Sequence, residues 1–84
     1  MIETIEQQVV KSRVIELTEK KMHHEDVIRE MNVLLNRDIT EQERLKYATK
    51  KTSAKKLLRT VEQMLSFNKS LLNNFDDFDY QLEN

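Results

Sequence analysis

The chain contains no cysteine, no glycine, no proline and no tryptophan. Without cysteine it can form neither a disulfide nor a thiolate zinc site. Without glycine it lacks the usual source of the positive φ angles that tight β-hairpins need. The same absence excludes glycine-rich phosphate loops and calcium loops of the EF-hand type. The absence of these residue types makes an all-α fold the expected class.

Aromatic residues are also few, at 6%, whereas charged residues make up 35% of the 84 residues and nearly cancel to a net charge of −1. A chain of this length forms one small domain with a limited core. No apolar run approaches the ~18 residues that a membrane span needs. The N-terminal residues include Glu3 and Glu6 and show no secretion signal. We therefore expect a soluble protein that is cytoplasmic, or nuclear if its source is eukaryotic.

The best local signal lies at residues 37–43, near the middle of the chain. Thr40 is followed three residues later by Glu43, which is the capping-box pattern of a helix start. This pattern predicts a long helical hairpin, with helices at about 2–36 and 41–74.

Apolar residues in the first predicted helix recur every three or four residues. This spacing is the heptad seam of a coiled coil, interrupted only by Lys21 and His24. A break near residues 22–25 stays open as an alternative, and it would give a three-helix monomer. The seam comprises Val10, Val14, Leu17, Lys21, His24, Ile28, Met31 and Leu35.

The second predicted helix begins basic and becomes strongly amphipathic after residue 56. We predict that its seam comprises Leu57, Val61, Met64, Asn68, Leu71, Phe75, Phe78 and Leu82, widened by Leu58, Leu65 and Leu72. Two helices alone cannot cover stripes this wide, so dimerisation into a bundle is expected. We assign residues 1–75 to one helical domain and residues 76–84 to an acidic-aromatic tail, with the helix fraying near residue 74.

No arrangement of residues predicts catalysis or a metal site. His23 and His24 are preceded by Lys20 and Lys21 at the spacing where a bundle metal site needs carboxylates. The serines have no paired base, and no cofactor motif is present. We expect a non-enzymatic protein without metal or cofactor.

A run of basic residues without an acid occupies positions 44–59. It could neutralise phosphates, which makes nucleic-acid binding a second hypothesis. It could equally be a solvated face, or pair with acids of the first helix. The candidate binding residues are Lys46, Lys50, Lys51, Lys55, Lys56 and Arg59.

The Lys-, Asn- and Glu-rich composition resembles that of small accessory proteins of AT-rich phages and mobile elements. That resemblance implies a regulator that binds one host or phage protein. The first hypothesis is therefore a non-enzymatic helical module that self-associates, as a homodimer, through its two seams and presents its charged faces to an unidentified protein partner. A scaffolding bundle that spaces other components is a third hypothesis.

Overall fold

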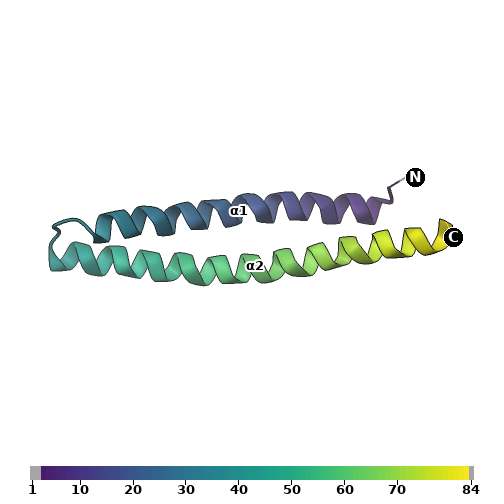
Figure 1. The fold of residues 1–84 in the computed structure, drawn as a ribbon. Coiled ribbons are helices and arrows are strands. Elements are labelled where there is room, and N and C mark those ends of the chain that lie inside the picture. Colours follow the sequence, from purple (N-terminus) through teal and green to yellow (C-terminus); the bar gives the residue numbers. More distant parts are fainter. Residues whose placement is uncertain (1–2, 84) are drawn as a thin grey trace.

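The chain folds into two long helices joined by a short turn. The computed structural model describes the backbone of residues 3–83 and the side-chain surroundings of residues 3–75. Helix α1 spans Ile5–Leu35 and helix α2 spans Glu41–Glu83. They lie side by side and antiparallel, with both chain ends at one end of a rod of 64 × 15 × 15 Å (Figure 1). Residues 3–83 contain no strand. The predicted all-α helical hairpin is confirmed.

Helix α1 is continuous through its two histidines. It begins at a capping box, in which the Gln7 amide donates to Thr4 Oγ1 at 3.1 Å and the Thr4 amide donates to Gln7 Oε1 at 2.8 Å. No break occurs near residues 22–25. Lys21 and His24 are half-buried at their seam positions. Because long amphipathic side chains bury their stems and keep their polar ends in water, these residues do not interrupt the helix.

The turn joins the helices without any residue of positive φ within residues 3–83. The predicted capping box starts α2, because the Glu43 amide donates to Thr40 Oγ1 at 3.1 Å and the Thr40 amide donates to Glu43 Oε1 at 3.2 Å. Arg44 Nη1 reaches across the turn to the carbonyl oxygen of Leu35 at 3.5 Å. The turn is therefore held by side-chain hydrogen bonds to helix ends and does not need glycine.

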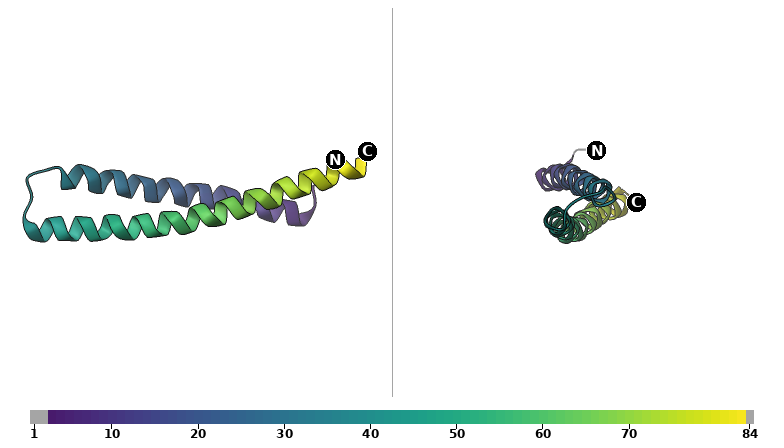
Figure 2. Two further views of the ribbon diagram at one scale, coloured as in Figure 1. Left: turned by 60° about the horizontal axis from the view of Figure 1, so that its bottom comes forward. Right: turned by 90° about the vertical axis from the view of Figure 1, so that its left-hand side faces the viewer.

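The seam of α1 faces α2 along the whole hairpin. Each of its eight predicted members is buried or half-buried, and Val10, Leu17 and Met31 are the most buried. The helices cross at a small angle, so the pair twists gently along its length (Figure 2). Leu17, Val61 and Leu65 form the central cluster, with Val14 packed against it. No described side chain falls below 2% exposure, so the core is thin.

Helix α2 continues beyond the end that we expected near residue 74 and reaches Glu83. The opposing effect of acids at a helix C-terminus therefore does not end the helix there. The side chains of the predicted acidic-aromatic tail, residues 76–84, lie outside the described part of the molecule. The same holds for the seam positions Phe78 and Leu82.

Candidate interaction surface

Helix α2 carries two parallel apolar seams, of which α1 covers one. The covered seam, called the first seam, consists of residues that are all buried or half-buried: Ala54, Leu58, Val61, Leu65, Asn68, Leu72 and Phe75. Its neighbour, called the second seam, repeats the three- and four-residue spacing without a charged member. The second seam consists of Leu57, Thr60, Met64, Phe67, Leu71 and Asn74.

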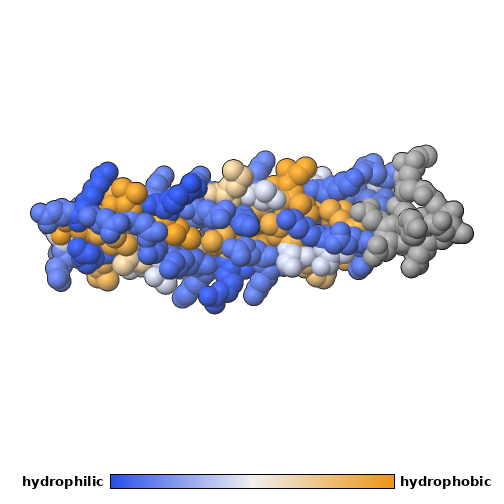
Figure 3. Space-filling view, viewed as in Figure 1, coloured by the Kyte–Doolittle hydropathy of each residue, from blue (hydrophilic) through white to orange (hydrophobic). Residues whose placement is uncertain are grey.

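The second seam is largely open to solvent. Leu57 is 53% exposed, Met64 49% and Phe67 63%. Leu71 is half-buried, and Thr60 and Asn74 are exposed. Figure 3 shows hydrophobic patches along the rod, interrupted and bordered by hydrophilic side chains. Exposed apolar side chains that recur along one line of a helix, with polar residues beside them, are typical of an interaction site.

The sequence periodicity predicts one broad seam on α2. In the structure, the residues of that predicted seam belong to two separate seams. In the first seam Val61 and Leu65 are buried and Leu58, Leu72 and Phe75 are half-buried, whereas Leu57, Met64 and the half-buried Leu71 belong to the second seam. A single partner helix covers one seam only, so one of two adjacent apolar lines must stay exposed. Phe67 was missed, although its spacing of three residues from Met64 and four from Leu71 signals a second seam.

An open groove lies beside the middle of the second seam. It is lined by Arg13 of α1 and by Gln63, Met64, Phe67 and Asn68 of α2. Asn68 is only 6% exposed, and its Nδ2 donates to the carbonyl oxygen of Met64 at 2.7 Å. Its Oδ1 is buried and has no hydrogen-bond partner among the described residues. A flipped amide would lose the bond to Met64, so this orientation is the favourable one. A buried acceptor without a donor is therefore present beside the groove.

The same flank continues toward the centre of the hairpin. There Leu57 and Val61 border an opening lined from α1 by Glu16, Lys20 and His23. The α1 side of this flank is thus polar, and the α2 side is apolar. A helix docking here would place its apolar stripe against α2 and its polar edge against α1.

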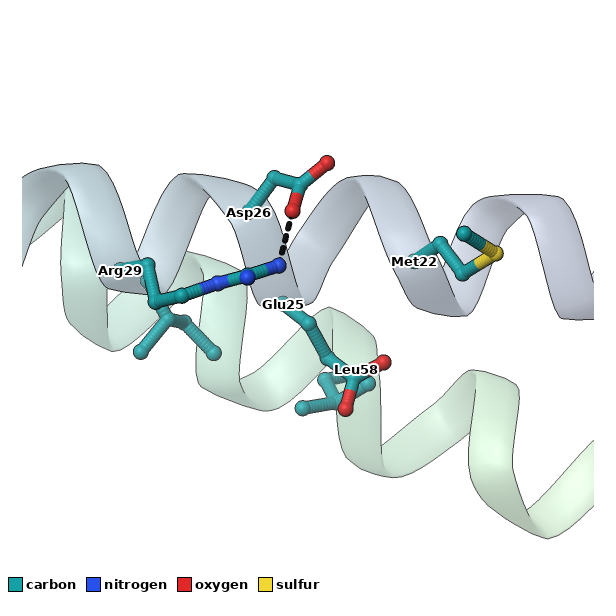
Figure 4. Close-up of a pocket in the computed structure, with 6 residues that line it drawn as sticks. Met22, Glu25, Asp26, Arg29 and Leu58 are labelled. Atoms are coloured by element: carbon teal, nitrogen blue, oxygen red, sulfur yellow. Dashed lines mark hydrogen bonds and ion pairs between the residues drawn. The ribbon is translucent and has the colours of Figure 1, made fainter.

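The opposite flank is lined by charged and apolar side chains together. Figure 4 shows Glu25 of α1 extending over Leu58 of α2, while Arg29 turns to form an ion pair with Asp26. These residues line a depression with Met22, which is exposed.

The basic stretch is a solvent-facing surface of α2. Lys46, Lys50, Lys55, Lys56 and Arg59 are exposed, and Lys51 is half-buried. Both ion pairs found among residues 3–75 lie elsewhere, namely Lys11 with Glu3 and Arg29 with Asp26. The alternative in which these cations pair with acids of α1 therefore does not describe the observed side chains.

The histidines form a small ring pair and not a ligand cluster. His23 is exposed and His24 half-buried, and their ring centroids are 5.6 Å apart with a tilt of 58°. Within the described residues, no three His, Asp or Glu side chains gather as a metal would require. Within the described residues, neither helix is long and apolar enough to span a bilayer.

Comparison with known proteins gives no relative from which a function could be transferred. No protein-family model matches the chain, and no curated protein or solved structure matches it either. The candidate site therefore rests on its own geometry.

Proposed function

We propose that this chain is a non-enzymatic helical interaction module, and that the second seam of α2 binds a helix of another protein chain. The observation that carries the proposal is the exposure of Leu57, Met64 and Phe67 on one uncharged line in a chain with 35% charged residues. Helix-in-groove recognition uses anchors at this three- and four-residue spacing. A large exposed aromatic such as Phe67 is a typical anchor of such interfaces.

The composition, which resembles that of phage accessory proteins, supports a regulatory role of this kind. Such a module would act by occluding or bridging its partner and would need no metal or cofactor. The polar rim formed by Glu16, Lys20 and His23 would orient the bound helix.

A photocrosslinker at the centre of the surface tests this function. Replacing Phe67 by benzoylphenylalanine keeps an aromatic side chain at the site, and illumination in cells should give a covalent adduct with a protein. The control carries the same group at Ser66, which is exposed and lies about 100° around the helix from Phe67. It should give no adduct. A folded position-67 variant that gives no protein adduct would contradict the proposed function.

A second candidate function is binding of nucleic acid by the basic stretch. The supporting observation is that five exposed cations there have no ion-pair partner among the described residues. Binding of a fluorescent DNA duplex, followed by anisotropy, should weaken steeply with salt because bound phosphates release counterions. The double variant Lys55→Glu, Lys56→Glu should abolish it. A lack of binding at low salt would exclude this candidate.

A further inference from the structure

We infer that the helix which occupies the second seam is α2 of a second copy of this chain. The two α2 helices would pack antiparallel about a two-fold axis at Met64 and join two hairpins into a four-helix bundle. The inference rests on the proposed function, because it names the partner of the same surface. Two properties of the second seam, the exposed area of the whole chain and the buried oxygen of the neighbouring Asn68 carry it.

The first property is the symmetry of the spacing. Leu57 and Leu71 each lie seven residues from Met64. An antiparallel pairing about Met64 therefore places Leu57 of one copy opposite Leu71 of the other and brings the two Met64 side chains together. A two-fold interface must be complementary to itself, and this order of residues meets that condition. A parallel pairing also has a two-fold axis, but that axis runs along the helices and would place Leu57 opposite Leu57 of the second copy.

The second property is charge. The second seam has no charged residue from Leu57 to Asn74, and charge depletion is typical of the centre of a protein interface. The outer edge beside it carries Lys56, Gln63 and Ser70. In the antiparallel pairing the two Gln63 residues meet, and Lys56 meets Ser70 of the second copy. No like charges are opposed across the axis.

The third property is the surface area. The chain exposes 6881 Å², whereas a compact monomer of its mass exposes about 5,300 Å². The excess of about 1,600 Å² exceeds the ~800 Å² that each partner buries in a stable interface. The elongated hairpin can therefore bury the area of a stable interface. After doing so, it would still expose at least as much surface as a compact monomer of the same mass.

The unpaired oxygen of Asn68 fits the same register. Pairing about Met64 brings Thr60 of the second copy to the level of Asn68. The Thr60 hydroxyl donates to the carbonyl oxygen of Lys56 at 3.2 Å and can rotate toward a new acceptor. A hydrogen bond to Asn68 Oδ1 would then satisfy the buried acceptor. One polar pair in an apolar seam is a known device for fixing register.

Sedimentation equilibrium tests the association. The wild type should have twice the 10.1 kDa mass of the chain. Phe67→Asp and Met64→Asp should raise the dimer Kd by about 100-fold or more, as truncation of a central interface residue does. Ser66→Asp should remain a dimer. Far-UV circular dichroism checks that each variant is still helical. A 10.1 kDa wild type at all concentrations, or a helical Phe67→Asp variant that stays a dimer, would overturn the inference.

Disulfide trapping tests the register without depending on destabilised variants. Because the chain has no cysteine, each introduced thiol reports on one position. Met64→Cys should oxidise to a covalent dimer, and Leu57→Cys should link to Leu71→Cys when the two chains are mixed. Ser66→Cys should stay monomeric under the same conditions. Efficient linking of Leu57→Cys to itself would indicate a parallel pair and overturn the proposed register.

The two proposals can fail separately. A photocrosslinked adduct at position 67 with the mass of two chains supports both. An adduct with a different protein, together with a monomeric wild type, leaves the interaction module standing and overturns the self-pairing.

Discussion

The two halves of the hairpin are built differently. In the apolar half, α1 up to residue 20 packs on α2 from residue 57 onward, and it contains the cluster of Leu17, Val61 and Leu65. In the turn half, the seam of α1 includes the half-buried Lys21 and His24, and Lys51 of α2 is half-buried as well. The apolar half therefore supplies most of the hydrophobic stabilisation. The turn half is positioned by its capping box and by the hydrogen bond from Arg44 to Leu35.

The largest effect is expected from a charge in the centre of the apolar half. Leu65 is 5% exposed, and Leu65→Asp would bury an unpaired carboxylate at a cost above about 4 kcal/mol. A small hairpin should then lose its helical circular dichroism. Leu45→Asp is the matched control in the turn half, because Leu45 is 70% exposed. It should change stability by less than about 0.5 kcal/mol. If Leu65→Asp unfolded cooperatively at the same temperature as the wild type, the apolar half would not be the main source of stability.

Large-to-small substitutions provide a finer comparison of the two halves. Leu17→Ala should cost about 3 kcal/mol because it opens the central cluster. Met31→Ala in the turn half should cost about 2 kcal/mol, although Met31 is also buried, because it lies outside that cluster. Urea denaturation of both variants measures the difference. If Met31→Ala lowered the free energy of unfolding more than Leu17→Ala does, the turn half and not the apolar half would supply most of the hydrophobic stabilisation.

Asn68 is the polar exception within the apolar half. Asn68→Leu removes the buried oxygen that has no partner among the described residues and should stabilise the hairpin by about 1 kcal/mol. The same change should loosen the register of association, since the polar position would no longer specify it. Thermal unfolding and disulfide trapping at Met64→Cys report the two effects. A loss of stability would show that the oxygen is satisfied in solution.

The smallest effect is expected at the turn. Thr40→Ala removes the hydroxyl that accepts from the Glu43 amide and should cost about 1 kcal/mol. Hydrogen exchange should speed up in the first turn of α2. Thr4→Ala removes the equivalent cap of α1, so it should speed exchange in the first turn of α1 and leave the turn between the helices unaffected. Equal exchange changes at both sites would mean that the caps act through global stability.

The sequence predicted the architecture because its strongest signals are local. The capping box at Thr40 and the seam from Val10 to Leu35 depend only on neighbouring residues, and both appear in the structure. The capping box of α1 between Thr4 and Gln7 was not identified, although a Thr–x–x–Gln pattern also favours it.

The choice between the two seams of α2 could not be made from periodicity. Leu57 with Met64 and Leu58 with Leu65 are equally apolar pairs with the same seven-residue spacing. Which pair is buried depends on how α1 crosses α2, and this is a property of the folded pair. Dimerisation and the identity of a partner stay predictions, because they concern surfaces that lie outside a single chain.

The length of the rod also has an electrostatic consequence. Lys50 and Met64 are fourteen residues apart on α2, which corresponds to about 20 Å at ~1.5 Å per residue. The Debye length at physiological ionic strength is about 8 Å. The turn-proximal charges around Lys46 and Lys50 are therefore screened from the centre of the second seam. A change in ionic strength would therefore alter the binding of charged partners near Lys46 and Lys50. It would hardly change the affinity of the apolar pairing at Met64.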